Sequence, residues 1–266
     1  MAHPPGVEIV ELAGVPIASL SRDAVVRIVG DALRAGRGGW VITTNVDHLK
    51  RCQSDRALAA LYHEADLVVA DGMPLLWATR LRRTPLPDRV AGSDLVGLLA
   101  ADAAEAGRSL YLLGGAPGAA EAAAAQLSRT IPELRLAGWS CPLVDPIPSD
   151  AQVDAVAREL QKASPDLVYV ALGAPKQEWL IHRLRERFPS TWWMGVGISL
   201  SFIANHVARA PAWMQRSGLE WLHRLSQEPE RLAKRYLLDD LPFAAMLLAR
   251  SLRERGRTRR RSTGRS

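Results

Sequence analysis

Short β-branched runs alternate with longer helix-like segments through most of this chain, and the runs end in glycine or polar turns. The strand-like runs cover residues 40–44, 66–70, 109–113, 134–139, 166–172 and 191–196. Helix-like segments cover residues 22–35, 49–65, 74–82, 117–130, 149–163 and 176–188. Apolar runs of this kind are typical of strands buried on both faces, and their alternation with helices is typical of a parallel sheet. We therefore predict an α/β fold: a Rossmann-like, mostly parallel sheet with helices on both faces.

The alternation stops near residue 199, and the chain from 211 onward has a helical pattern throughout. Residues 250–266 contain eight arginines and one glutamate, while the whole chain of 266 residues carries a net charge of +6, so the remainder is close to neutral. We predict an α/β core at 1–198, a helical C-terminal appendage at 199–250 and a disordered Arg-rich tail at 251–266.

Several classes of protein do not fit this composition. Apolar runs stay well short of the ~20 residues that span a bilayer, and the N-terminus lacks the pattern of a signal peptide. The two cysteines, Cys52 and Cys141, have no metal-ligand spacing and suit a reducing compartment. The basic tail has no aromatic residues to stack on bases, which argues against a nucleic acid partner. We expect no metal and no cofactor, since neither a D-x-D pair nor a Cys/His cluster occurs.

Polar and glycine residues follow five of the predicted strands, at the sheet edge where open α/β folds bind ligands. These residues are Thr43-Thr44-Asn45, Asp71-Gly72, Gly114-Gly115, Gly173 with Lys176-Gln177-Glu178, and Gly195-Val196-Gly197. The turns at Gly114-Gly115 and at Gly173–Lys176 suit a phosphate, because glycine amides approach closely and a helix N-terminus follows. The alternative is that these glycines only allow tight turns between strand and helix. Neither turn has the spacing of a dinucleotide-binding fingerprint or a P-loop.

Asp71 lies between a strand and a helix that both look buried. A carboxylate in such a place is costly to desolvate unless it is hydrogen-bonded or functional. A structural alternative is that Asp71 caps the helix over 74–82, which begins with Pro74. For Glu178 the alternative is a favourable contact with the positive end of its own helix, and for Arg89 it is a solvated loop charge.

Six motifs together resemble one family. They are TTNVDHL, ADGMPLLW, DRVAGSDL, YLLGGAPG, ALGAPKQEWL and RAPAWMQRSGLEWLHRLSQEPERLAKRYL, in this order. The set is similar to the TagA/WecG/CpsF glycosyltransferases, glycosyltransferase family 26, over about residues 8–240. Each motif alone is weak, but LGAPKQE combined with the long C-terminal motif is specific.

The resemblance implies an inverting, metal-independent glycosyltransferase of bacterial cell-surface polymer synthesis. It would move an N-acetylmannosamine-like sugar from a UDP-sugar to an undecaprenyl-diphosphate-linked acceptor, with Asp71 as the base. The implied pocket residues are Thr43, Asn45, Arg89 and Gln177, and the implied arginines and lysine of the appendage are Arg224, Arg231, Lys234 and Arg235. The resemblance also implies a cytoplasmic protein on the inner face of the membrane, with a homo-oligomer as a further possibility.

The C-terminal segment supports the same expectation from its own pattern. Apolar residues from Tyr236 to Leu252 form a stripe beside an Arg-rich end, a pattern typical of helices on anionic membrane surfaces. The alternative is a helix packed on the core, followed by a solubilising tail.

The chain departs from the family pattern at two positions. Ser201 stands where the family commonly has Asp, and Asn205 where it commonly has Gly.

Two other functions remain open at this point. A nicotinamide-dependent Rossmann enzyme would need a glycine fingerprint after its first strand, which is missing here. A non-catalytic, membrane-associated protein that binds nucleotide sugars would keep the pocket but show no turnover.

Overall fold

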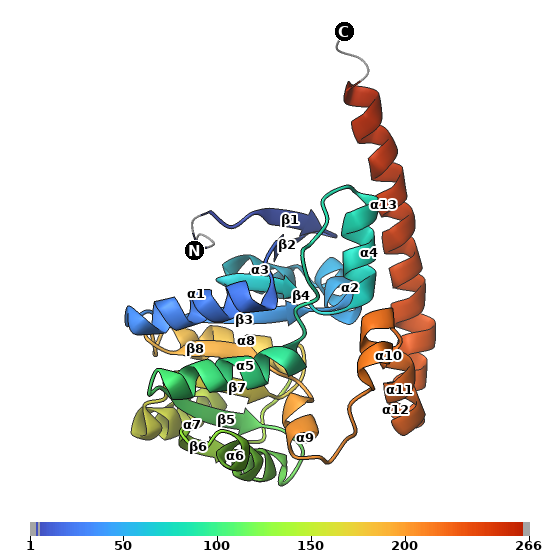
Figure 1. The fold of residues 1–266 in the computed structure, drawn as a ribbon. Coiled ribbons are helices and arrows are strands. Elements are labelled where there is room, and N and C mark those ends of the chain that lie inside the picture. Colours follow the sequence, from blue (N-terminus) through green and yellow to red (C-terminus); the bar gives the residue numbers. More distant parts are fainter. Residues whose placement is uncertain (1–3, 5, 263–266) are drawn as a thin grey trace.

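A six-stranded sheet forms the centre of the molecule (Figure 1). The computed structural model describes residue 4 and residues 6–262. The strand order is β4-β3-β8-β7-β5-β6, and each neighbouring pair is parallel. The strands are β3 (Gly39–Thr44), β4 (Leu67–Ala70), β5 (Ser109–Gly114), β6 (Arg135–Ser140), β7 (Leu167–Ala171) and β8 (Trp192–Gly195). Because the strands are parallel, their carboxyl ends meet at one edge of the sheet.

Helices cover both faces of this sheet, as the sequence predicts. One apolar cluster is formed with helices α1 (Arg22–Arg34), α5 (Gly92–Glu105) and α6 (Ala119–Thr130). The other is formed with α2 (Val46–Ser54), α3 (Arg56–Glu64), α7 (Asp150–Ala163) and α8 (Lys176–Arg185). Strands β3, β4, β5, β7 and β8 are buried on both faces, which explains their continuous apolar runs. The α/β fold class is therefore confirmed.

Local sequence signals account for where several elements begin. Ser21 caps α1 by accepting a hydrogen bond from the amide of Ala24, and Ser149 forms a capping box on α7. The single helix predicted over 49–65 is wrong, because Asp55 ends α2 and caps α3 through the amide of Leu58. The N-terminal residues form a separate antiparallel pair, β1 (Ile9–Leu12) and β2 (Val15–Ala18).

The helix α9 (Ser199–Ile203) belongs with the core, although the boundary predicted at 198/199 places it in the appendage. It packs against α6 and α5, and its Leu200 is fully buried in the core cluster. Ser201 is also buried in α9. Asn205 follows with a φ of 57°, a left-handed conformation that glycine adopts most easily and asparagine tolerates. Asparagine therefore fits this backbone position, where the resemblance led us to expect glycine.

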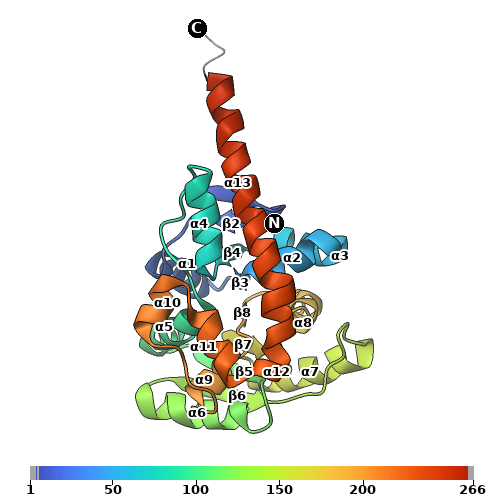
Figure 2. The same cartoon turned by 90° about the vertical axis from the view of Figure 1, so that its right-hand side faces the viewer.

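The C-terminal segment continues as α10 (Ala212–Ser217), α11 (Glu220–Gln227), α12 (Pro229–Ala233), a π-helical turn η1 (Lys234–Asp240) and α13 (Leu241–Ser262). Figures 1 and 2 both show α13 as a long helix alongside α4 (Met73–Leu81). Phe243 and Leu247 of α13 are buried in the core. The appendage is thus built onto the core at α13, while α10 to α12 lie beside the carboxyl edge of the sheet.

The sequence predicts a disordered tail from residue 251, but residues 251–262 continue α13 as a helix. Arginine is a good helix former, and extending an existing helix avoids the cost of nucleating a new one. The remainder of the predicted tail, residues 263–266, lies outside the described residues. No helix in the described part of the chain is long and apolar enough to cross a bilayer.

Candidate active site

Three predicted site residues, Thr43, Asn45 and Asp71, lie where β3 and β4 end. The backbone amide of Asp71 donates to the carbonyl of Thr44 at 2.7 Å, which places the two strand ends side by side. Gly92, at the start of α5, lies over both strands: its amide donates to Asp71 Oδ2 at 3.3 Å. A Cβ on Gly92 would lie only 2.9 Å from Thr43 Oγ1. Asn45 follows directly and caps α2 through the amide of His48.

Asp71 does not cap the helix that follows it, so that structural alternative is wrong. The residue at the N-cap of α4 is Gly72, which has no side chain to offer. Its φ of 130° turns the chain so that the Asp71 carboxylate faces α5 instead, where it accepts from the first-turn amide of Gly92. Burial raises the pKa of Asp71 to about 6, with Arg89 opposing the rise and Glu220 adding to it. Such a carboxyl group can exchange a proton near neutral pH.

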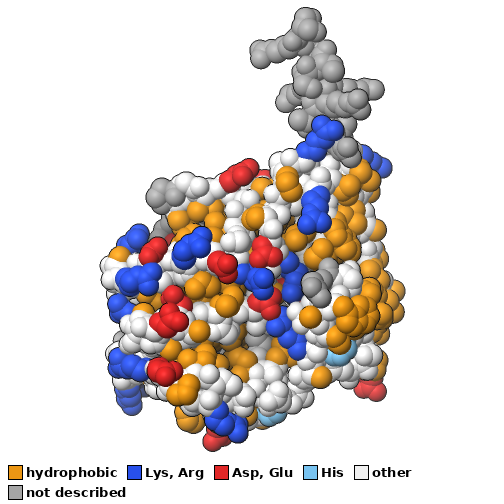
Figure 3. Space-filling view, in the orientation of Figure 1, with side chains coloured by type: hydrophobic (Ala, Val, Ile, Leu, Met, Phe, Trp, Pro, Cys, Tyr) orange, Lys and Arg blue, Asp and Glu red, His pale blue; other side chains and the backbone are white. Residues whose placement is uncertain are grey.

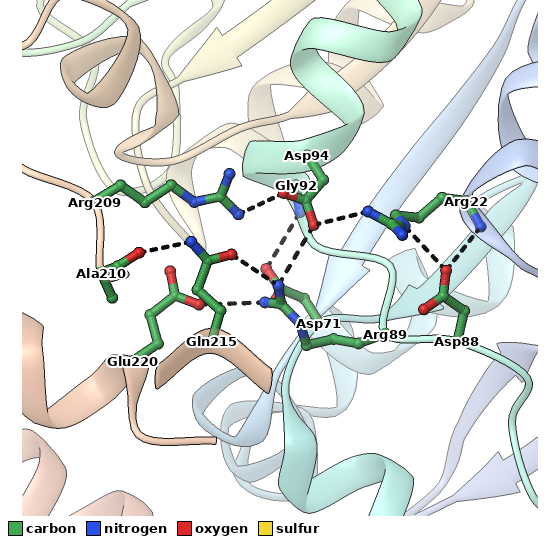
Figure 4. A network of polar contacts seen from close by, with 10 residues as sticks. All are labelled: Arg22, Asp71, Asp88, Arg89, Gly92, Asp94, Arg209, Ala210, Gln215 and Glu220. Atoms are coloured by element: carbon green, nitrogen blue, oxygen red, sulfur yellow. Dashed lines mark hydrogen bonds and ion pairs between the residues drawn. The ribbon is translucent and has the colours of Figure 1, made fainter. Parts of the chain in front are cut away.

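Arg89 is the hub of a charged network beside Asp71 (Figure 4). Its Nη1 lies 3.6 Å from Asp71 Oδ1 and 3.2 Å from Glu220 Oε2. Its Nη2 lies 3.4 Å from Asp94 Oδ2 and 3.4 Å from Gln215 Oε1. Only 14% of its side chain is exposed, so Arg89 is not the solvated loop charge of the alternative interpretation.

The network joins the core to the C-terminal segment. Arg209, in the linker before α10, contacts Asp94 Oδ1 at 2.5 Å. Gln215 donates to the carbonyl of Ala210 and so stiffens the same linker. Among the members of the network that sequence reasoning missed are four charged or amide side chains near Arg89: Asp94, Arg209, Gln215 and Glu220. All four lie inside the motifs quoted above, but Glu220 is separated from Arg89 by 131 positions, and no local spacing indicates such a contact.

Gln177 and Glu178 are both buried, at the first turn of α8. Gln177 Nε2 donates to Glu178 Oε1 at 2.9 Å, and Gln177 Oε1 accepts from the amide of Gly197 at 3.2 Å. The Gln177 side chain therefore ties α8 to the turn after β8. Burial raises the pKa of Glu178 to about 7, and its Oε2 has no hydrogen-bond partner among the described residues.

Replacing Gly195 by alanine tests the placement of Gln177. A Cβ at Gly195 would lie 2.5 Å from Gln177 Nε2, so the amide would have to leave its bonds to Glu178 and Gly197. We expect the free energy of unfolding to fall by about 2 kcal/mol, as for other overpacked cores. Urea unfolding measures this. The control is Gly97→Ala on α5, where a Cβ meets nothing within 4 Å; equal stabilities of the two variants would contradict the placement.

The two glycine turns also lie at this edge. Gly114 and Gly115 have φ of 92° and 99°, and the amide of Gly115 donates to the carbonyl of Ala171, which joins the ends of β5 and β7. Gly173 has a φ of 74° and precedes the N-terminus of α8. Lys176 Nζ donates to the carbonyl of Val144, in the loop after β6.

The predicted basic residues of the appendage are placed unequally. Arg224 Nε is buried without a hydrogen-bond partner in the described chain. Arg235 Nε lies 3.8 Å from Asp240 Oδ2, and the Arg235 guanidinium lies over the Tyr236 ring. Lys234 is exposed. The side chain of Arg231 lies outside what the structure describes. Within the described residues, no group of three or more His, Cys, Asp or Glu side chains could hold a metal ion.

Known proteins are similar to this chain over most of its length. The Glycosyl transferase WecG/TagA/CpsF family matches residues 10–257. A Bacillus subtilis (strain 168) N-acetylglucosaminyldiphosphoundecaprenol N-acetyl-beta-D-mannosaminyltransferase is 31% identical over 194 residues, 73% of each chain. A protein of the same description from Bacillus spizizenii (strain ATCC 23059 / NRRL B-14472 / W23) is 30% identical over 199 residues, 75% of each chain. This chain therefore belongs to the WecG/TagA/CpsF family of glycosyltransferases.

Proposed function

We propose that this enzyme transfers an N-acetylmannosamine-like sugar from a UDP-sugar to an undecaprenyl-diphosphate-linked acceptor, with inversion at the anomeric carbon. The names of the two Bacillus relatives support the sugar and the lipid-linked acceptor. The glycine turns and the helix N-termini at the sheet edge support a phosphate-containing donor. The product would be a precursor of a cell-surface polymer.

Asp71 is the proposed base. The acceptor hydroxyl attacks the anomeric carbon, its proton passes to the Asp71 carboxylate, and the bond to the UDP oxygen breaks on the opposite face. A pKa of about 6 leaves Asp71 mostly ionised at neutral pH yet more basic than an ordinary aspartate. Its Oδ2 bond to Gly92 fixes the carboxylate, and its side chain is 30% exposed, which leaves room for a substrate.

Charge develops on the leaving diphosphate, and we propose that protein cations stabilise it without a metal. Arg89 offers a planar fork that suits two phosphate oxygens. Arg224 is partly buried, with a guanidinium nitrogen that has no protein partner in the described chain. Thr43 and Asn45 lie at the same edge and would orient the donor, while Gln177 supports that edge by tying α8 to the turn after β8.

The observation that carries this proposal is the Asp71–Arg89 pair at the carboxyl edge of the sheet. The test is an assay of the purified protein with UDP-N-acetylmannosamine and a polyprenyl-diphosphate-linked N-acetylglucosamine, with products read by mass spectrometry. We expect a lipid-linked disaccharide with the β configuration. Binding of UDP-sugars without transfer to this or other lipid-linked acceptors would favour the non-catalytic alternative.

We also propose that the C-terminal segment docks on the membrane that holds the acceptor. Figure 3 shows hydrophobic side chains gathered along the side of the molecule where α10 to α13 lie. The exposed large apolar residues there are Trp213, Leu222, Leu237, Leu238, Leu241 and Leu252. A contiguous exposed apolar surface beside basic residues suits an anionic bilayer.

Replacing Leu238 by glutamine, together with Leu237→Gln, is expected to reduce flotation with anionic liposomes severalfold, because apolar side chains drive insertion. Leu238 is 69% exposed, so the fold should be kept. Deleting residues 237–266 is a poorer test, since it removes Phe243 and Leu247 from the core. The control is Leu98→Gln on α5, which is 40% exposed on the core. Equal flotation of wild type and the double variant would exclude these leucines from docking.

A further inference from the structure

Glu220 of α11 reaches the same guanidinium nitrogen as Asp71. Arg89 Nη1 lies 3.2 Å from Glu220 Oε2 and 3.6 Å from Asp71 Oδ1, so the carboxylate of the C-terminal segment is the nearer of the two (Figure 4). The Glu220 side chain is 23% exposed and the Asp71 side chain 30% exposed, so water screens this contact only in part.

We propose that Glu220 is a positioning residue for the transfer: by holding Arg89, it keeps the Asp71 carboxylate from a close ion pair and free to accept the proton. This inference rests on the proposed function of Asp71 as the base. It gives α11 of the C-terminal segment a part in setting the state of the base, beyond membrane docking and the proposed contact of Arg224 with the diphosphate.

The charges around Asp71 support this role of Glu220. Arg89, from the loop after α4, stabilises the Asp71 anion, and so does the amide of Gly92 at the start of α5. Glu220, from α11, and Asp94, from α5, act in the opposite direction. Besides Arg89, Asp94 is contacted by Arg209 and, at 3.7 Å, by Arg22, so two further cations offset its charge. Glu220 has no contact of this kind beyond Arg89 among the ion pairs of the described residues.

The contact forms only when the C-terminal helices are seated on the core. Gln215 of α10 accepts from Arg89 Nη2, and Arg209 of the linker binds Asp94. The linker, α10 and α11 therefore all contact the core at Arg89 or Asp94. Gly218, between α10 and α11, packs so tightly on α4 that a Cβ would lie 2.9 Å from the Cβ of Met73. The position of Glu220 is therefore set by packing as well as by charge.

The test compares pH profiles of kcat/KM for the full-length protein and three variants. Glu220→Gln removes the negative charge that contacts Arg89 and keeps the shape of the side chain at position 220. Gln215→Ala removes a neutral contact of Arg89, and Glu230→Gln removes one charge from an exposed position on α12. We expect Glu220→Gln to move the acidic limb toward lower pH by about one unit, because losing a nearby like charge stabilises the Asp71 anion. Its plateau should fall severalfold, because the base is weaker.

Gln215→Ala is expected to lower the rate without moving the limb, and Glu230→Gln to leave the profile unchanged. Burial also raises the pKa of Glu178 to about 7 and that of Asp240 to about 6, but Glu220 is not among the groups that shift either one, so a moved limb reports Asp71. An unmoved limb in Glu220→Gln would overturn the proposal. If the wild type shows no transfer, the proposed function fails instead, and carbon-13 NMR titration of Asp71 in both proteins still decides the inference: equal pKa values overturn it.

Discussion

Replacing Asp71 by asparagine is expected to lower kcat by about three orders of magnitude with the fold intact, since general base catalysis supplies rate factors of this size. Asparagine can keep the bond from the Gly92 amide through its carbonyl oxygen but cannot accept the acceptor's proton. The rate of sugar transfer under saturating donor and acceptor measures the loss, and circular dichroism with thermal unfolding verifies the fold.

The pH dependence follows from the raised pKa of Asp71. A base is active when ionised, so wild-type kcat/KM should fall as the pH drops below about 6. Stability depends on pH in the opposite direction. The folded protein holds the Asp71 proton more tightly than the unfolded chain, so the contribution of Asp71 to the free energy of unfolding declines as the pH rises from about 4 to 6. The Asp71→Asn variant should therefore be at least as stable as wild type at pH 8.

The control is Asp55→Asn, the same substitution at the far end of α2. Asp55 caps α3, and asparagine caps as well as aspartate, so both activity and stability should remain near wild type. Near-normal turnover of folded Asp71→Asn would remove Asp71 from the role of base.

Replacing Arg89 by alanine is expected to have two effects. The kcat/KM should fall about a hundredfold or more, the cost of removing one preorganised group that stabilises charge in the transition state. The free energy of unfolding should fall by about 2 kcal/mol, because Asp71, Asp94 and Glu220 lose their shared cation in a partly buried place. Steady-state kinetics and urea unfolding measure the two effects separately.

Arg89→Lys separates charge from geometry. Lysine restores a cation and much of the stability, but it lacks the fork that binds two phosphate oxygens, so kcat/KM should stay low. Arg27→Ala, an exposed arginine on α1, is the control for loss of a charge. Full activity in Arg89→Lys would mean that Arg89 contributes charge alone, and full activity in Arg89→Ala would exclude it from the site.

Much of the site could be predicted because it depends on local pattern. The turns after β3, β4, β5, β7 and β8 were placed from the ends of apolar runs, and parallel strands bring such ends to one edge. Side-chain direction could not be predicted in the same way. Gln177 lies buried between Glu178 and Gly197, and the bond of Asp71 to the Gly92 amide of α5, which excludes the alternative that it caps α4, is visible only in the structure.

By itself, the sequence determined the α/β class, the strand ends and the family, because periodicity, glycine turns and motif order are written in local stretches of chain. Only the tertiary structure decided what surrounds Asp71. Arg89, Asp94 and Glu220 come from a loop, a core helix and the C-terminal segment, and their contacts depend on how helices pack across the sheet edge. Charge interactions depend on distance and burial, and neither follows from spacing along the chain.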